Sequence, residues 1–111
     1  YIRDEATGIF WSPTLLPSGG ASPYVTRHGF GYSVFEHRED GIESELTVFV
    51  AIDAPVKFCV LKLRNASGRS RRLSVTGYVQ WVLGDEARKT RMQVSTRVDA
   101  GSGALFASNP Y

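Results

Sequence analysis

The alternation of apolar and polar side chains with a period of two constrains this fold more than any other sequence feature. It is clearest in residues 42–50, where Ile42, Val48 and Val50 alternate with Glu43 and Glu45. Because successive side chains of an extended strand point to opposite faces, this pattern predicts a strand with one inward and one outward face. Further strands are predicted at residues 32–37, 56–64, 73–83, 92–100 and 104–107.

Turn-forming residues separate the predicted strands. Residues 39–41 and 101–103 favour tight turns, and residues 65–70 predict a hairpin loop that joins strand 56–64 to strand 73–83. Residues 1–22 are rich in Gly and Pro, so we expect a long loop with brief extended pieces. Only residues 84–91 allow even one helical turn. The prediction is therefore an all-β fold, an antiparallel β-sandwich.

The length of 111 residues fits one domain, so we predict a single β-sandwich spanning residues 1–111. The chain lacks an initiating Met, a signal peptide and a tail-like C-terminus, which favours a fragment of a larger domain. No apolar stretch approaches the ~20 residues that cross a bilayer, so no direct membrane contact is expected. Strand-like sequence near both ends predicts exposed strand edges and hence self-association, for example as a homodimer.

The charge balance argues against a nucleic-acid partner. Thirteen Lys and Arg face eleven Asp and Glu, giving a net charge of +2, and the basic clusters around residues 64–72 and 88–91 lack interleaved aromatic residues. Phosphate contact at these clusters is conceivable, but solvated turns are the favoured interpretation.

Metal and cofactor chemistry is not predicted. The single cysteine, Cys59, lies in an apolar run and is expected to be a buried thiol; without a disulfide, a cytoplasmic location is favoured. His28 and His37 are too few for a metal site. The Gly29-Phe30-Gly31 run precedes a strand instead of following one, so it does not form a phosphate-binding loop.

Two groups of residues could act on or bind a sugar. Glu43 and Glu45 share a face of one strand, and paired carboxylates cleave glycosidic bonds, although solvated charges are the favoured interpretation. No catalytic residue is therefore predicted. Aromatic rings near Arg and His suit sugar recognition, so Trp11, Arg27 and His28 are the predicted substrate-binding residues, with ordinary packing as the alternative.

A series of motifs resembles the N-terminal β-sandwich of the cellobiose-phosphorylase-like enzymes, glycoside hydrolase family 94, formerly glycosyltransferase family 36. In the first third they are Tyr1-Ile2-Arg3-Asp4-Glu5, Thr7-Gly8, Phe10-Trp11-Ser12-Pro13-Thr14 and Arg27-His28-Gly29-x-Gly31-Tyr32. The later ones include Leu63-Arg64-Asn65-x-Ser67-Gly68, Tyr78-Val79-x-Trp81-Val82-Leu83-Gly84 and Asn109-Pro110-Tyr111. Within the family, the Trp81-Val82-Leu83-Gly84 motif is most similar to the phosphorylase-like region of cyclic β-1,2-glucan synthases.

The resemblance implies that the parent enzyme carries its catalytic Asp and phosphate-binding groups on an (α/α)₆ barrel that is absent here. The fragment itself is then expected to be inactive and to support the substrate region and subunit contacts. By the same resemblance, the parent is expected to be a glycosyltransferase or glycoside phosphorylase that acts on β-glucans, and similarity to the glucan synthases implies an enzyme bound to the inner membrane. The alternative from another class is a free-standing carbohydrate-binding or protein-interaction β-sandwich.

Overall fold

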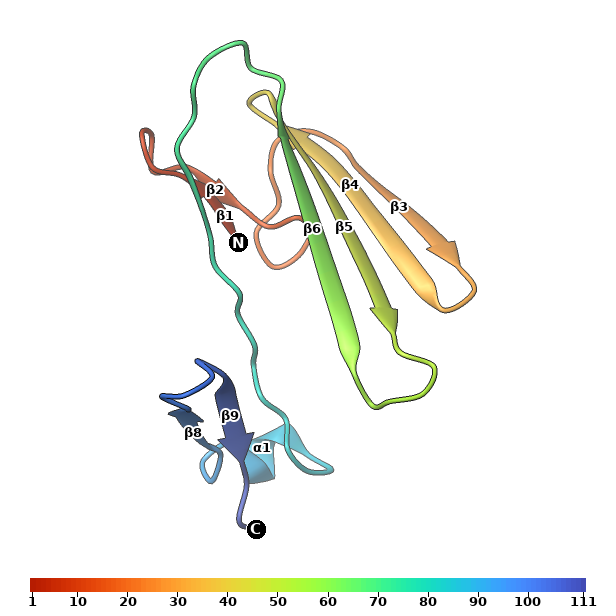
Figure 1. Ribbon diagram of the computed structural model, residues 1–111, viewed down its shortest axis with the longest axis vertical. Helices are drawn as coiled ribbons and strands as arrows, with labels where there is room; N and C mark the ends of the chain where they lie inside the picture. Colours follow the sequence, from red (N-terminus) through yellow and green to blue (C-terminus); the bar gives the residue numbers. More distant parts are fainter. The chain divides into compact units, whose positions relative to one another are not determined.

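A computed structural model describes residues 1–111 as two compact units, Tyr1–Gly77 and Tyr78–Tyr111. Apart from one short helix, the regular structure consists of antiparallel strands (Figure 1). This confirms the all-β prediction. That residues 1–111 form a single domain stays a prediction, and each unit is described by itself.

The largest element is a four-stranded antiparallel sheet in the first unit. It consists of β3 (Tyr24–Gly29), β4 (Tyr32–Glu39), β5 (Ile42–Val50) and β6 (Lys57–Asn65), which lie side by side in chain order. The turn between β4 and β5 is Asp40-Gly41, and both residues have a positive φ, 44° and 76°. A two-residue turn of this type, usually Asn-Gly or Asp-Gly, matches the twist of a hairpin and so fixes the register of β4 and β5.

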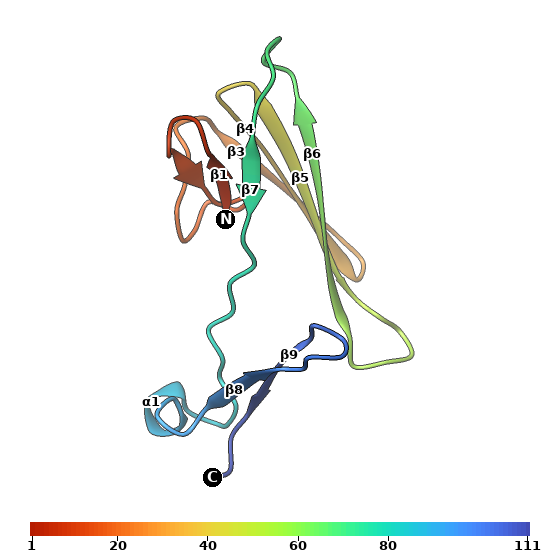
Figure 2. The same cartoon turned by 60° about the vertical axis from the view of Figure 1, so that its left-hand side comes forward.

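A smaller sheet packs against one face of the large one. Its strands are β1 (Ile2–Asp4), β2 (Phe10–Trp11) and β7 (Leu73–Val75), in the order β2-β1-β7. Figure 2 shows β1 and β7 facing the large sheet near the β4–β5 turn. The core between the sheets contains Ile2, Trp11 and Ile42, all at most 1% exposed, with Leu61 and Leu73 partly buried against them. Two packed layers confirm the sandwich prediction.

Arg71 ties the two sheets together. Its guanidinium donates to the Asp4 carboxylate of β1, with Nε 2.9 Å from Oδ2, and to the Asp40 backbone carbonyl in the β4–β5 turn at 2.6 Å. The Asp4 carboxylate also accepts a hydrogen bond from the Ala6 amide at 2.7 Å. The Ala6 amide and the Arg71 side chain lower the pKa of Asp4, and Asp4 in turn raises the pKa of Arg71.

The long strand predicted at residues 73–83 is wrong in its extent and in its pairing. Only Leu73–Val75 is a strand, and it pairs with β1 instead of forming a hairpin with β6. Strand β7 is three residues long because β1, its partner, is also three residues long, and no strand of residues 1–111 pairs with residues 76–83. Strand β3 was not predicted, because its polar Arg27-His28 pair interrupts the apolar pattern.

The prediction that Cys59 is buried is also wrong. Cys59 is exposed on the edge strand β6, opposite Val48. The core of the first unit includes Leu61 of the same strand, and Cys59 lies two residues further from the β4–β5 turn. The small sheet covers only one end of the large sheet, so the apolar run around Cys59 lacks a covering layer.

The second unit is a hairpin with one helical turn. It contains α1 (Ala87–Thr90), β8 (Ser95–Val98) and β9 (Leu105–Ser108), and β8 pairs only with β9. Residues 84–91, for which a loop or one helical turn was predicted, contain the helical turn. Both predicted strands are present, but β8 is shorter than residues 92–100 and β9 is shifted by one residue from 104–107. In the turn of the hairpin, hydrogen bonds from the Ser102 hydroxyl and amide lower the pKa of Asp99. No helix in residues 1–111 has the length and apolarity that a bilayer span requires.

Candidate functional site

The face of the large sheet opposite to Ile42 carries ordered rows of charged side chains, and we call it the ladder face. Paired residues of neighbouring strands share a face, so the register aligns side chains across the sheet. One row runs Val25–Glu36–Glu45–Lys62 over β3, β4, β5 and β6, and the row nearer the β4–β5 turn runs Arg38–Glu43–Arg64. The ladder face therefore presents acidic groups on β4 and β5 beside basic groups, and acidic and basic residues alternate across the row nearer the turn.

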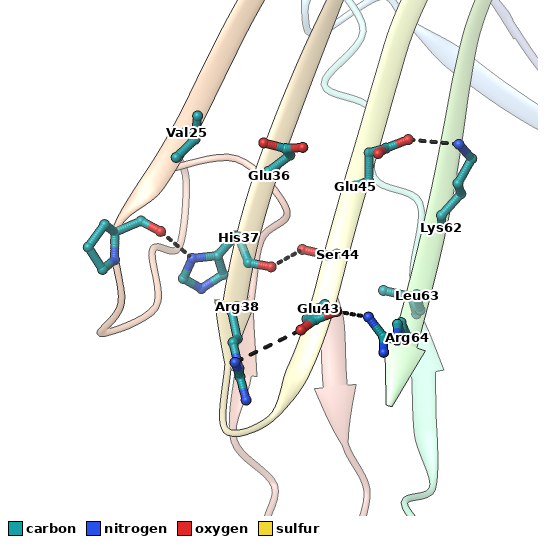
Figure 3. Close-up of a pocket in the computed structure, with 11 residues that line it drawn as sticks. Val25, Glu36, His37, Arg38, Glu43, Ser44, Glu45, Lys62, Leu63 and Arg64 are labelled. Atoms are coloured by element: carbon teal, nitrogen blue, oxygen red, sulfur yellow. Dashed lines mark hydrogen bonds and ion pairs between the residues drawn. The ribbon is translucent and has the colours of Figure 1, made fainter. Parts of the chain in front are cut away.

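Each carboxylate of the ladder face has a basic partner. Lys62 Nζ lies 2.8 Å from Glu45 Oε1, and Arg64 lies 3.2 Å from Glu43 (Figure 3). Arg38 approaches Glu43 from the other side at 3.9 Å, and Arg27 of β3 pairs with Glu36. These pairs are largely exposed to solvent, so they orient side chains more than they stabilise the fold.

The rows enclose a groove of about 480 Å³, whose lining includes Pro23, Glu36, Glu45 and Lys62. On the opposite face of the sheet, the buried ring of His37 stacks on Tyr24 with ring centroids 3.7 Å apart, and its Nδ1 lies 3.2 Å from the Pro23 carbonyl. These contacts hold the start of β3 in place. Cations beside carboxylates, both within reach of a ligand, form a surface that can donate to and accept from hydroxyl groups.

The geometry favours binding over acid catalysis. Glu36 and Glu45 lie directly opposite each other on β4 and β5, and paired carboxylates are the groups that cleave glycosidic bonds. A general acid must donate a proton, but Glu36 accepts from Arg27 and Glu45 from Lys62, whose pKa it raises. Residues 1–111 contain no group of three or more His, Cys, Asp or Glu placed to hold a metal ion.

The structure does not bring together the three residues predicted to bind substrate. Trp11 is 1% exposed in the core, and its indole Nε1 has no hydrogen-bond acceptor. Arg27 lies on the ladder face, whereas His28, its neighbour, points to the opposite face and meets the Ser33 hydroxyl at 2.8 Å. Sugar contact by these residues stays a prediction, and among them Arg27 is the one in contact with the ladder face.

Sequence periodicity places Glu43 and Glu45 on one face, which the register confirms, but it does not identify their partners. Glu36, Arg38, Lys62 and Arg64 were missed as site residues. Their signal was present as charges spaced by two in three predicted strands. Only the register, set by the Asp40-Gly41 turn and the β5–β6 connection, shows that opposite charges meet.

The comparisons with known proteins agree with this fold. The glycosyl hydrolase 94 supersandwich domain family matches residues 1–111. The cyclic β-(1,2)-glucan synthase NdvB of Rhizobium meliloti (strain 1021) is 37% identical over 112 residues, covering 100% of this chain and 4% of the synthase. The solabiose phosphorylase of Paenibacillus borealis is 37% identical over 89 residues, covering 79% of this chain and 12% of the phosphorylase.

The N,N′-diacetylchitobiose phosphorylase of Vibrio furnissii is 33% identical over 84 residues, covering 73% of this chain and 10% of its own length. No solved structure matches the chain significantly. The chain thus spans between 4% and 12% of the length of these relatives. With a match along its whole length, the chain belongs to the glycosyl hydrolase 94 supersandwich domain family.

Proposed function

We propose that this chain is the non-catalytic β-sandwich portion of a larger carbohydrate-active enzyme, where it supports the substrate region. The observation that carries the proposal is the family match over residues 1–111. The ladder face adds to it, because its carboxylates accept from cations and are arranged to bind hydroxyl groups instead of donating a proton.

In the intact enzyme we infer glycosyl transfer or phosphorolysis of β-glucans, with the bond-breaking groups on another part of the polypeptide. The solabiose and N,N′-diacetylchitobiose phosphorylases among the relatives support phosphorolysis, and the cyclic β-(1,2)-glucan synthase supports glycosyl transfer with β-glucans as the substrate class. No observation specifically favours the alternative of a free-standing module. A cytoplasmic location of this segment is part of the proposal, supported by a single cysteine and no disulfide.

Self-association is a further part of the proposal. The large sheet ends in β3 and β6, and neither has a partner on its outer side within residues 1–111. An unpaired edge offers a row of backbone donors and acceptors to a second copy. We expect concentration-dependent dimers in light scattering. A strict monomer at high concentration would contradict this part.

A chimera tests the function. The segment of the Rhizobium meliloti glucan synthase that matches residues 1–111 would be replaced by this chain, and glucan synthesis measured beside the parent enzyme and a variant lacking the segment. We expect the chimera to regain activity to within about tenfold of the parent (about 1.4 kcal/mol in activation free energy), and the deletion variant to be inactive.

Two outcomes would contradict the proposal. One is a folded chimera without activity, shown by a parent-like thermal unfolding profile. The other is turnover of a β-1,2-glucan by the isolated chain in the presence of phosphate, because the chain would then contain the catalytic groups itself. Circular dichroism of each protein is the folding control.

A further inference from the structure

A row of aromatic rings crosses the ladder face at the end away from the Asp40-Gly41 turn. The register aligns Gly29, Tyr32, Phe49 and Phe58, one residue from each strand of the large sheet. The rings of Phe49 and Phe58 stack with centroids 5.0 Å apart and an interplanar angle of 21°. Tyr32 is 50% and Phe58 43% exposed, so the row is an open aromatic surface. We call these three rings the aromatic row.

Glycine at position 29 lets Tyr32 lie flat on the sheet. A Cβ atom at residue 29 would collide with the Tyr32 ring, and it would lie 2.7 Å from the Tyr32 hydroxyl oxygen. The ring therefore covers the backbone of Gly29 and turns its other side outward, as aromatic residues do over glycines of edge strands. With strands ~4.8 Å apart, three neighbouring rings form a surface ~10 Å wide.

The aromatic row lies beside a second groove of about 790 Å³, whose lining includes Phe30, Thr47, Ile52 and Asp53 as well as the row. Two polar groups, Asp53 and Thr47, thus border a mainly apolar surface. Mostly apolar lining with a few polar groups is the usual character of small-molecule sites. Stacked rings with nearby hydrogen-bonding groups match the two sides of a sugar: its C–H faces and its hydroxyls.

The ladder face continues from the aromatic row toward the charged rows. Four residues along a strand separate the aromatic row from the Glu36–Glu45–Lys62 row, a distance of ~13 Å at the usual rise. The charges there are already paired with one another, so they offer hydrogen bonds without a strong net attraction for a charged partner. A neutral, hydroxyl-rich chain longer than one sugar fits both ends of this face.

We propose that the aromatic row is a stacking subsite for a neutral β-glucan chain, which extends along the strands toward the charged rows. This inference rests on the proposed function for its choice of substrate class. It goes beyond that function by assigning the contact to Tyr32, Phe49 and Phe58. Arg27, predicted from the sequence, pairs with Glu36 between the two ends and lies beside the path of the chain.

Titration of the intact 111-residue chain with a linear β-1,2-linked glucooligosaccharide tests the subsite. Affinity would be measured by calorimetry and the contact located by NMR shift changes. We expect the shifts at Tyr32, Phe49 and Phe58, and about tenfold weaker binding in Phe58→Ala. Phe106→Ala is the matched control, because Phe106 is 46% exposed but lies in the second unit. Its affinity should equal that of the unsubstituted chain.

Substitution of Gly29 tests whether the position of the Tyr32 ring matters for binding, because it moves the ring without removing it. Gly29→Ala keeps every ring but forces the Tyr32 ring to move, so it should weaken binding severalfold. Gly77→Ala is its control, because nothing lies within 4 Å of a Cβ at that position. Circular dichroism checks that both variants fold.

Three results would overturn the subsite: no binding by the unsubstituted chain, unchanged binding by Phe58→Ala, or shift changes confined to residues outside the aromatic row. Dimers that Phe58→Ala converts to monomers, without any glucan binding, would instead make this surface an interface between copies. The chimera result is independent of all these outcomes. An active chimera with an unaffected Phe58→Ala titration would reject the subsite and retain the proposed function.

Discussion

The two units of this chain have similar alternating sequences but reach different degrees of burial. In Tyr1–Gly77, two sheets face each other and bury Ile2, Trp11 and Ile42 almost completely. In Tyr78–Tyr111, a two-stranded hairpin and one helical turn leave Thr90 as the only buried residue. Alternation makes strands in both, whereas a core forms only where a second layer covers the alternating face.

Polar contacts differ in the same way. The first unit holds Arg71, with a side chain 4% exposed, between Asp4 and Asp40, which are distant in sequence. The second unit relies on local contacts, such as the Asp99 carboxylate that accepts from Ser102 three residues on. We therefore expect the first unit to unfold cooperatively and the second to open at lower free energy.

Removing the core ring should have the largest effect on this difference. Trp11→Ala deletes the largest buried side chain of the first unit and should lower the free energy of unfolding by about 3–5 kcal/mol, much of a small domain's stability. Urea denaturation followed by circular dichroism measures the loss. An unchanged midpoint would show that the two units do not differ in their dependence on a core.

Trp11→Phe is the matched variant. It keeps an aromatic ring but removes the indole N–H, which is buried without an acceptor and so costs about 1–3 kcal/mol. Trp11→Ala and Trp11→Phe both remove this cost, but Trp11→Phe also keeps most of the ring packing, so it should cost clearly less than Trp11→Ala. Equal losses in the two variants would mean that an aromatic ring at position 11 contributes little packing energy.

Asp4 and Asp99 both have a lowered pKa, which predicts that the stability of each unit depends on pH in the acid range. The pKa of Asp4 is lowered in the folded state, so as pH falls the unfolded state binds protons first. The stability from Asp4 is present above the ordinary carboxyl pKa of about 3.9 and is lost as pH falls through the lower folded value. The pKa of Asp99 is also lowered, so its contribution to the stability of the second unit is likewise lost as the pH falls.

Asp4→Asn should therefore destabilise the first unit at neutral pH, and its difference from the unsubstituted chain should shrink as the pH falls below about 4 and disappear below the lowered folded-state pKa of Asp4. Asp99→Asn is the control; its effect should be smaller and confined to amide exchange in residues 95–108, because its partners are local. Urea midpoints across the pH range measure the first effect. A gap for Asp4→Asn that persists in acid would mean that the charge of Asp4 is not the cause.

The fold class could be predicted from the sequence because it depends on local patterns. The pairing of strands that are distant in the sequence could not be predicted in this way. The Asp40-Gly41 turn and the alternation of residues 42–50 specify β4, β5 and their hairpin. Nothing local says that Leu73 pairs with Asp4 of β1, sixty-nine positions earlier, so the hairpin with residues 56–64 was the wrong prediction. Long-range pairing also decides how far β7 extends and whether Cys59 is covered.

The candidate site shows the same limit. Glu43 and Glu45 could be placed on one face from periodicity alone, and that placement holds. The aromatic row needs the registers of two strand pairs at once, so Tyr32, Phe49 and Phe58 gave no signal as separate residues. Conversely, Trp11, Arg27 and His28, which were predicted to bind substrate together, are separated: Trp11 lies in the core, and the other two lie on opposite faces of the large sheet.

Substitution of Trp81, which lies in the second unit, tests whether the two units unfold independently. The alternating pattern places it in the apolar set of a long strand, where its loss would unfold the chain, but residues 76–83 form no strand and Trp81 is only partly buried. We expect Trp81→Ala to change NMR shifts within Tyr78–Tyr111 and to leave the free energy of unfolding of the first unit, measured with urea, unchanged within about 0.5 kcal/mol. Unfolding of the whole chain would show that the units are one cooperative structure.

The smallest expected effect lies in the β8–β9 hairpin. Arg97 and Phe106 are directly paired across the strands, and the Arg97 guanidinium lies 4.7 Å from the centre of the Phe106 ring. A cation–π contact at an exposed site is worth about 0.5–1 kcal/mol, so Arg97→Gln should speed amide exchange in β8 and β9 by about two- to fivefold. Phe106→Leu and the double variant complete a cycle that isolates the pair. The hairpin has few other contacts, so the loss of one exposed contact should speed its amide exchange measurably. Removal of the exposed Arg64–Glu43 pair should change amide exchange in the first unit less, because two packed sheets stabilise that unit. A larger change in the first unit than in the hairpin would contradict the distinction between the units.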